Sequence, residues 1–374
     1  MEEKRNSSVM SSSASIILTS LLLTGIGLLV IYTSSSIPAY QKFGDSLFFF
    51  RKQAAVSFIG IVLIILIHKI PFRWIEILTL PALFISLIFL SFCLVPGIRQ
   101  TANGATRWIR LFGITFQPAE LAKLSLILFL SKNLSRPSFD INKISSGIIP
   151  NLIVFSIFGV LLMIQPDFGS TFMLFLLTFL MLFTAGLSRK YIATSLGCGI
   201  VFIGLAILEA PYRIARLLTF IDPWSDLQRG GFQIIQSYLG FQNGGLFGLG
   251  LGESKQKLYF LPEAHTDFIL SVIGEELGLL GVLFIISCFL YLTYLGIKIT
   301  RKQRDQYKKF LCFGLTAMIS LQAAINMGVC MGALPTKGIP LPFVSSGASS
   351  LVIFLISVGL LSKLGLDANK HTDV

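Results

Sequence analysis

One short segment, FLPEAHTDF at residues 260–268, gathers side chains that can accept or donate protons. It holds two carboxylates, Glu263 and Asp267, together with His265, one of only three histidines in 374 residues. A long apolar run starts at the next residue, so Asp267 lies at the start of a predicted helix. Asp is a common helix N-cap, but capping explains neither Glu263 nor His265. A carboxylate in a partly dry place can also take a proton from a hydroxyl group, which makes Asp267 a candidate general base.

A second segment, NGATRWIRLFGITFQPAELAKL at 103–124, places two opposite charges in an apolar context. Pro118 suits the first turn of a helix. Glu120 and Lys123 follow three residues apart, so they share a helix face. A charge within a membrane span is costly and tends to face a cavity or a partner. The pair either helps the helix to start or is a buried pair that shapes a functional cavity.

A third segment, PTKGIPLPFVSSGASSL at 335–351, has three prolines, two glycines and four serines around Lys337. Such a composition breaks a helix and exposes backbone polar groups. In a membrane protein this is tolerated where the chain lines protein or water. The segment is therefore either a plain external turn or a stretch that lines a functional cavity, where Ser346 and Lys337 would be candidate binding groups.

Two other features have simpler explanations. Arg213 and Arg216 lie just outside a predicted span, where they either reach lipid headgroups or bind the phosphate of an anionic lipid substrate. The run GGLFGLGLGES at 244–254 contains G-x-G-x-G, but it follows no strand of a βαβ unit. We expect a closely packed or flexible turn there rather than a dinucleotide site.

The elements that must position these groups are membrane helices. The mean hydropathy is +0.79 and 54% of the residues are hydrophobic. Apolar runs long enough to cross a bilayer recur along the chain, and a barrel would show short alternating segments instead. The fold class is therefore an all-α polytopic bundle of about ten transmembrane helices. We predict them at 14–32, 53–68, 75–95, 118–131, 147–164, 168–187, 191–209, 268–297, 310–333 and 343–363.

The distribution of charge orients this bundle. With the N-terminus inside, the inner segments hold 17 Lys and Arg and the outer ones 12, five of which lie in the long loop 210–267. Lys and Arg concentrate in cytoplasmic loops, so the net charge of +12 reflects topology and no nucleic acid partner is expected. We predict a disordered cytoplasmic tail at 1–13, a transmembrane domain at 14–363 and a cytoplasmic tail at 364–374.

The outer side should carry the remaining loops at 33–52, 96–117 and 334–342. The loop 210–267 is rich in apolar and aromatic residues, so we expect an ordered segment with a short amphipathic helix at 231–241. The five cysteines lie in or beside predicted spans without metal-ligand spacing, and we expect no disulfides.

Three separate stretches resemble the signature segments of one bacterial family. They are FLPEAHTDFILSVIGEELGLLG from residue 260, RW at 107–108 followed by FQPAELAK, and LPTKGIPLPFVSSGASSL from residue 334. In this order they resemble the SEDS family (shape, elongation, division and sporulation), which comprises the FtsW, RodA and SpoVE glycosyltransferases. The resemblance runs from about Gly25 to Ser362. PEAHTDF, DPW and LPTKG favour the FtsW/SpoVE branch, whereas SSGAS departs from the SYGGS more usual there.

The resemblance implies an inverting glycosyltransferase that polymerises lipid II into β-1,4-linked glycan at the outer face of the bacterial plasma membrane. It places the catalytic aspartate at Asp267, a paired acid and base at Glu120 and Lys123, and a motif arginine at Arg107. It also implies a class B penicillin-binding protein as the transpeptidase partner, within a division or elongation complex surrounded by membrane lipids.

The residues suit this chemistry. The acceptor sugar hydroxyl must lose a proton, and the departing lipid diphosphate needs positive charge more than it needs an acid. That charge could come from a divalent cation, Mg²⁺ or Mn²⁺, with Asp267 as a possible ligand, or from the basic residues Arg107, Lys123, Arg213 and Arg216. The other candidate groups around the substrate are Glu263, His265, Lys337 and Ser346.

Two other function classes remain open. A flippase for the same lipid would distribute polar residues through the membrane depth, whereas the intramembrane charges here are chiefly Glu120 and Lys123. A non-catalytic scaffold would recruit cell-wall proteins and would tolerate Asp267→Asn.

Overall fold

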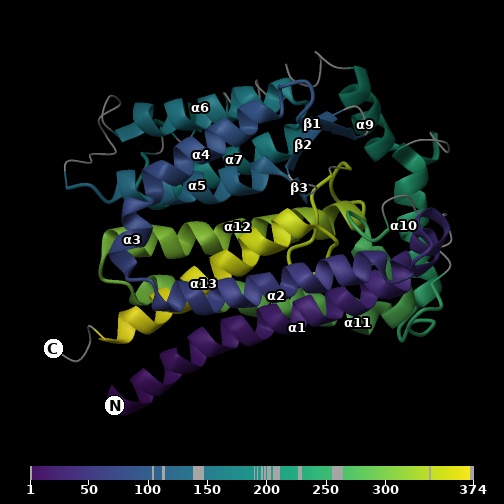
Figure 1. Cartoon of the computed structure of the whole chain (residues 1–374), viewed down its shortest axis with the longest axis horizontal. Coiled ribbons are helices and arrows are strands. Elements are labelled where there is room, and N and C mark those ends of the chain that lie inside the picture. Colours follow the sequence, from purple (N-terminus) through teal and green to yellow (C-terminus); the bar gives the residue numbers. More distant parts are fainter. Residues whose placement is uncertain are drawn as a thin grey trace.

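The structure is a computed structural model that describes most of the chain. The described residues are 2–102, 105–111, 114–137, 147–188, scattered positions from 190 to 204, 211–225, 230–254, 264–336 and 338–370. Long helices lie side by side in one bundle, and both chain termini lie at the same end of it (Figure 1). The opposite end carries a small sheet and two helices that stand outside the bundle, α9 (Pro211–Ile221) and α10 (Gly230–Gly244).

Within the described ranges, nine helices of the bundle coincide with predicted spans. They are α1 (Glu2–Phe43), α2 (Phe48–Lys69), α4 (Thr79–Phe92), α5 (Pro118–Leu134), α6 (Ile149–Ile164), α7 (Phe168–Thr184), α11 (Ile269–Lys302), α12 (Gln306–Cys330) and α13 (Ala348–Lys370). Five of the described helices (α1, α2, α11, α12 and α13) are long and apolar enough to cross a membrane, and α4, α6 and α7 are shorter apolar helices. The span predicted at 191–209 lies mostly outside the described residues. The polytopic all-α fold is thus confirmed.

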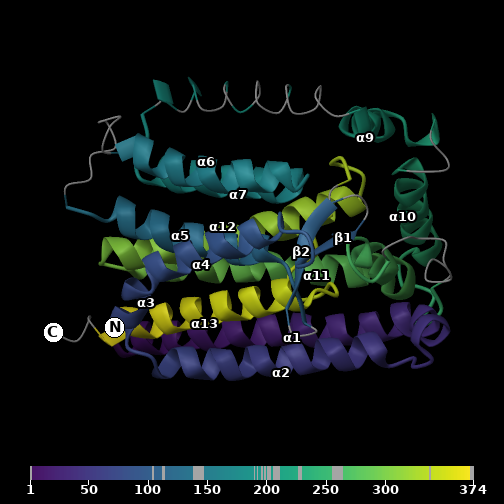
Figure 2. The ribbon, with the colours of Figure 1, turned by 45° about the horizontal axis from the view of Figure 1, so that its top comes forward.

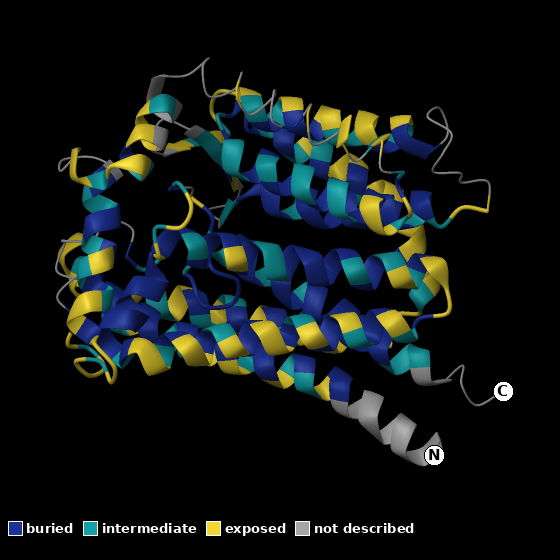
Figure 3. Cartoon of the chain, turned by 180° about the vertical axis from the view of Figure 1, so that it is seen from behind, coloured by how far each residue is buried: buried dark blue, intermediate teal, exposed yellow. Residues whose placement is uncertain are grey.

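The core of the bundle is formed by α5, α12 and α13, which pack against one another and against most of the remaining helices. Most residues of α5 are buried, including the two charged residues Glu120 and Lys123. By contrast α2 and α4 expose large apolar side chains such as Phe58 and Phe84, and Figure 3 shows the exposed residues collecting on the outer helices. Apolar side chains on the outside are what a bilayer requires of a helical bundle.

Two sequence predictions about the first helix are wrong. The segment 1–13, expected to be a disordered tail, is helical from Glu2 as part of α1, and α1 runs on to Phe43, well beyond residue 32. The sequence predicts an outer loop at 33–52, but only the short turn between the end of α1 and the start of α2 lies outside the helices. The Ser-rich start and the polar residues after 32 lack apolar periodicity, but they contain no glycine that would end a helix.

The segment 96–117, expected to be an outer loop, contains a sheet. Strands β1 (Arg99–Ala102), β2 (Ala105–Leu111) and β3 (Ile114–Phe116) pair antiparallel in the order β1-β2-β3. In the sequence, Asn103-Gly104 separates the first two strands, and this pair is a strong hairpin signal. The sheet lies at the end of the bundle that also carries α9 and α10 (Figure 2).

Two short segments elsewhere are as predicted. The helix expected at 231–241 is α10. A short 3-10 turn, η2 (Pro223–Ser225), follows α9. The Gly-rich run after α10 packs tightly on a kink in α11 at Gly278, which has φ of 67°. Leu249 and Gly250 donate backbone hydrogen bonds to the carbonyls of Glu275 and Glu276, at 2.9 and 3.0 Å. The run is therefore a closely packed turn.

The four described cysteines, Cys93, Cys288, Cys312 and Cys330, are buried free thiols. A further short helix, α3 (Phe72–Ile77), links α2 to α4.

Candidate functional site

Asp267 lies in the turn that leads into α11, and it is not the N-cap of that helix. The N-cap is Phe268, which makes no side-chain capping bond, so the capping explanation for Asp267 is wrong. The Asp267 carbonyl accepts hydrogen bonds from Asn326 Nδ2 at 2.8 Å and from Cys330 Sγ at 3.3 Å. The backbone of Asp267 is thereby fastened to α12, while the residue as a whole stays partly exposed.

The segment between α12 and α13 docks against this turn. Ser345 Oγ donates to the carbonyl of Thr266 at 2.6 Å, and the Ser346 backbone N–H donates to the carbonyl of His265 at 3.0 Å. On its other side the segment is held by Gln53 of α2, which bonds the backbone of Ser345 and Gly347 at 3.3 Å each. Its apolar residues Ile339, Leu341, Phe343 and Val344 are buried. The segment therefore lines the interior of the protein and is not a plain external turn.

Arg107 reaches the same place from the sheet. It lies on β2, and its Nη2 donates to the carbonyl of Pro166 at 2.7 Å. A Cβ atom on Gly338 would lie 3.3 Å from Asp267 Oδ2 and 3.6 Å from Arg107 Nη1. The carboxylate and the guanidinium thus approach one small space beside Gly338 from different elements. A proton acceptor and a fixed cation at one space can serve a reaction in which a hydroxyl attacks and an anion departs.

Asp167 completes this cluster, and the sequence analysis missed it. It is buried, caps α7 by accepting from Ser170 N and Oγ at 3.2 and 2.7 Å, and lies 3.6 Å from Arg107 Nε. An Asp followed three residues later by Ser at a helix start reads only as a cap. Its second role depends on β2 lying beside the start of α7, which no local pattern encodes.

Glu120 and Lys123 form a buried pair on α5, so the burial that one of the two interpretations expected is confirmed, while a role in a functional cavity stays a prediction. Lys123 Nζ lies 2.8 Å from Glu120 Oε1, and both residues are 2% exposed. Lys123 also donates to Gln322 Oε1 at 2.5 Å, and Gln322 Nε2 donates to the Pro340 carbonyl at 3.0 Å. The pair is therefore linked through α12 to the segment that carries Gly338, and it does more than start a helix.

The remaining predicted residues have mixed outcomes. The His265 ring lies 5.0 Å from the Phe49 ring. Arg216 is exposed on α9, with Nη1 3.4 Å from the Thr336 carbonyl, so it lies beside the segment that precedes Gly338. Arg213 is on α9, but its side chain lies outside the described residues, and so do Glu263 and Lys337. Among the described residues no cluster of three or more His, Cys, Asp or Glu could hold a metal ion.

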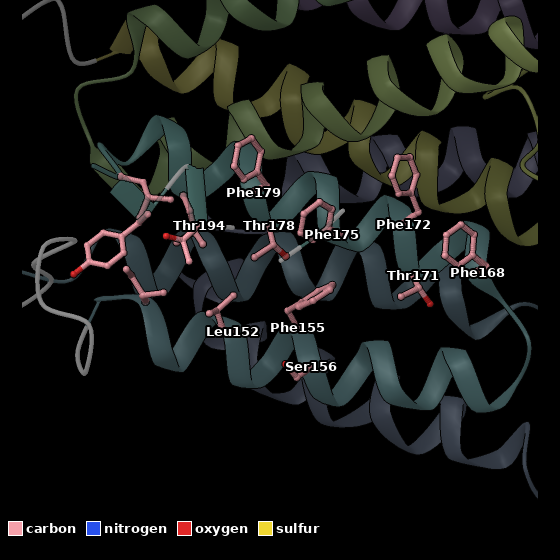
Figure 4. Close-up of a pocket in the computed structure, with 15 residues that line it drawn as sticks. Leu152, Phe155, Ser156, Phe168, Thr171, Phe172, Phe175, Thr178, Phe179 and Thr194 are labelled. Carbon is pink, nitrogen blue, oxygen red and sulfur yellow. The ribbon is translucent and has the colours of Figure 1, made fainter. Parts of the chain in front are cut away.

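An apolar cavity of about 380 Å³ begins next to this cluster. It lies between α6 and α7 and is lined by aromatic residues of α7, including Phe168, Phe172, Phe175 and Phe179 (Figure 4). Phe168 directly follows Asp167, so one end of the cavity lies beside the partner of Arg107. Tyr191, Thr194 and Gly199 line it from the segment after α7.

The chain is similar to known proteins along nearly its full length. The family described as "Cell cycle protein", which covers FtsW, RodA and SpoVE, matches residues 13–370. A "Probable peptidoglycan glycosyltransferase FtsW" of Geobacter metallireducens is 41% identical over 346 residues, covering 92% of each chain. "Stage V sporulation protein E" of Bacillus subtilis is 40% identical over 355 residues, covering 92% of this chain and 94% of its own.

Solved structures share the fold. One chain, described under "Structural coordination of polymerization and crosslinking by a peptidoglycan synthase complex", superposes with a TM-score of 0.78 at 25% identity, covering 94% of this chain and 97% of that one. The rod shape determining protein RodA of Thermus thermophilus superposes with a TM-score of 0.69 at 24% identity, covering 94% and 96%. With the family match spanning all nine described helices of the bundle, and relatives this similar over nine-tenths of its length, the chain belongs to the FtsW/RodA/SpoVE family of cell cycle proteins.

Proposed function

We propose that this protein is a peptidoglycan glycosyltransferase that polymerises lipid II into β-1,4-linked glycan strands, with Asp267 as the general base. The observation that carries the proposal is the approach of the Asp267 carboxylate and the Arg107 guanidinium to one space beside Gly338. The names of the FtsW relatives support the reaction class.

Asp267 and Arg107 have different tasks in the proposed reaction. The carboxylate of Asp267 takes the proton from the acceptor sugar hydroxyl as its oxygen bonds to the donor's anomeric carbon. The bond from that carbon to the lipid diphosphate breaks in the same displacement, which inverts the configuration at the carbon. Arg107 lies where it can stabilise the departing diphosphate, and Asp167 and the Pro166 carbonyl orient the guanidinium. Arg216, beside Thr336, is a second cation for the same anion.

A divalent cation, Mg²⁺ or Mn²⁺, is an additional proposed source of positive charge at Asp267. We expect chelation of free divalent ions to lower polymerisation and readdition to restore it. Activity that persists unchanged in chelator would remove the metal from the proposal and leave Arg107 and Arg216 as the cations.

We propose that the site faces outward and the termini inward. Both termini lie at the end of the bundle opposite the sheet, α9 and α10 (Figure 1). The basic residues from Lys298 to Lys309, at the end of α11, in the turn after it and at the start of α12, support a cytoplasmic position for the loops at that end. The proposed partner is a class B penicillin-binding protein in the division complex. The solved relative described as part of a complex that coordinates polymerization and crosslinking supports such a partner.

The test is glycan synthesis from labelled lipid II by the purified protein together with its transpeptidase partner. We expect polymer from the wild type and none from Asp267→Asn, with both proteins showing the same thermal unfolding and the same binding of the partner. A wild type that makes no polymer, yet moves lipid II across vesicle membranes, would establish the flippase alternative. Equal polymer from both proteins would keep the enzyme and remove Asp267 from the chemistry.

A further inference from the structure

Helix α12 carries a row of buried polar residues on the face toward the candidate site. Gln322, Asn326 and Cys330 follow one another at intervals of four residues, so they line one helix face. Each is at most 1% exposed. Buried polar groups are costly unless they are hydrogen-bonded, and here each of the three bonds the backbone of a segment that borders the reaction space.

Asn326 differs from its two neighbours because it bonds both segments at once. Its Nδ2 donates to the Asp267 carbonyl at 2.8 Å and to the Ile339 carbonyl at 2.8 Å. An amide NH₂ has two hydrogens, so this one group uses its full donor capacity. The two acceptors are both carbonyl oxygens, which only the amide nitrogen can satisfy, so the orientation of the side chain follows from chemistry.

The two carbonyls belong to the backbone on either side of the reaction space. One is that of Asp267 itself, and the other is that of Ile339, the neighbour of Gly338. Gly338 is the residue beside which Asp267 Oδ2 and Arg107 Nη1 meet. Asn326 therefore helps to set the separation between Asp267 and Gly338, together with the bonds that Ser345 and Ser346 make to the carbonyls of Thr266 and His265.

We propose that Asn326 is a positioning residue that fixes the Asp267 carboxylate relative to Gly338 and Arg107. This inference rests on the proposed function, because it assigns Asn326 a role in the reaction at Asp267. Among the hydrogen bonds to the backbone that borders this space, Cys330 Sγ makes one to the Asp267 carbonyl, weakly through sulfur, and Gln322 makes one to the Pro340 carbonyl. Both therefore support one side of the space, while Asn326 joins the two sides.

The experiment compares Asn326→Leu with a matched control, Asn151→Leu. Leu is close to Asn in size but donates no hydrogen bond. Asn151 is equally buried, on α6, and its Nδ2 donates to the Gly147 carbonyl, so its loss has a similar structural cost in another part of the bundle. We expect Asn326→Leu to lower kcat about 10- to 100-fold, as small misplacements of reacting groups do, with KM for lipid II almost unchanged. Asn151→Leu should keep a kcat near that of the wild type.

A third variant, Asn326→Gln, tests rescue. Gln keeps both amide hydrogens on a longer side chain, so its kcat should lie between those of the wild type and Asn326→Leu. A kcat for Asn326→Leu equal to that of Asn151→Leu would overturn the proposal. A rise in KM with kcat unchanged would also overturn it, because that pattern belongs to a binding role.

Hydrogen exchange gives a readout that does not depend on activity. We expect faster exchange of the backbone amides of 264–268 and 338–346 in Asn326→Leu and no such change there in Asn151→Leu. If the wild type makes no polymer but these amides behave as expected, the proposed function fails while the restraint by Asn326 stands. If exchange in both segments is unchanged in Asn326→Leu, the positioning role is wrong whatever the activity.

Discussion

At the scale of single residues, the site depends on Gly338 having no side chain. Gly338 has no Cβ, and the position that a Cβ would take is in contact with Asp267 Oδ2 and Arg107 Nη1. Its φ is outside the left-handed region, so an alanine there is not opposed by backbone strain. The glycine leaves room for reacting groups rather than allowing an unusual turn.

Gly338→Ala should therefore lower polymerisation while the protein stays folded. The added methyl would lie 3.3 Å from the base and 3.6 Å from the cation. We expect a loss of about tenfold or more, since a small displacement of reacting groups is costly. Steady-state glycan synthesis measures the effect. Gly347→Ala in the same segment is the control, because its Cβ would make only an ordinary contact at 3.6 Å with Ser350 Cβ. Equal activity of the two variants would contradict the interpretation.

Two substitutions of Asp167 separate its role as the cap of α7 from its role as the negative charge beside Arg107. In Asp167→Asn the side-chain oxygen can still cap α7 at Ser170, but the negative charge beside Arg107 is lost. We expect thermal stability close to that of the wild type and clearly lower polymerisation. Asp167→Ala should lose the same activity and in addition about 1 kcal/mol of stability from the missing cap. If Asp167→Asn is fully active, the restraint of Arg107 by Asp167 does not matter for the reaction.

At the scale of elements, α5 brings a buried ion pair into the centre of the bundle. Lys123 bonds Glu120 on its own helix and Gln322 on α12, and its Nζ also lies 5.8 Å from the centroid of the Phe354 ring of α13. The pair therefore joins the three helices of the core at one point. A buried pair need not add net stability, but removing one partner leaves an uncompensated charge.

Lys123→Met should destabilise the protein by about 3–5 kcal/mol, because Glu120 would remain buried without its partner. The double variant Glu120→Leu/Lys123→Met should recover much of that loss. Thermal unfolding in detergent measures both. A double variant that is stable but makes no polymer would show that the charges act on the reaction, while a single variant as stable as the wild type would contradict the buried pair.

At the scale of the whole molecule, the bundle separates a basic end with both termini from an end that carries the candidate site. The site end also presents apolar side chains to the outside, including Phe247, which is 80% exposed in the Gly-rich turn after α10. This arrangement predicts that a reagent added outside the cell reaches the end that carries the candidate site.

In a variant with all native cysteines replaced by alanine, Phe247→Cys should react with a membrane-impermeant maleimide in intact cells. Lys370→Cys, at the end of α13, should react only after permeabilisation. The opposite pattern would reverse the orientation proposed from the positive charges. Replacement of Cys330 also removes its contact with the Asp267 carbonyl, so this background is used for topology and not for activity.

The sequence by itself determined the class of the protein and the positions of most spans, and it named Asp267 as the candidate base. Apolar runs and the spacing of Glu120 and Lys123 are local patterns, and a helix turns such patterns directly into faces and lengths. Motif resemblance added Arg107. Local periodicity failed where composition is ambiguous, at the Ser-rich start of α1 and at the strands of 99–116.

Only the tertiary structure decided how the site is assembled. Arg107, Asp167, Asp267 and Gly338 come from a sheet, the start of α7, the turn before α11 and the segment after α12, far apart along the chain. Asn326 likewise gains its role from two carbonyls that lie 59 and 13 residues away in sequence. No local pattern encodes these meetings, because they are fixed by how helices pack against one another, through contacts between residues with no regular spacing.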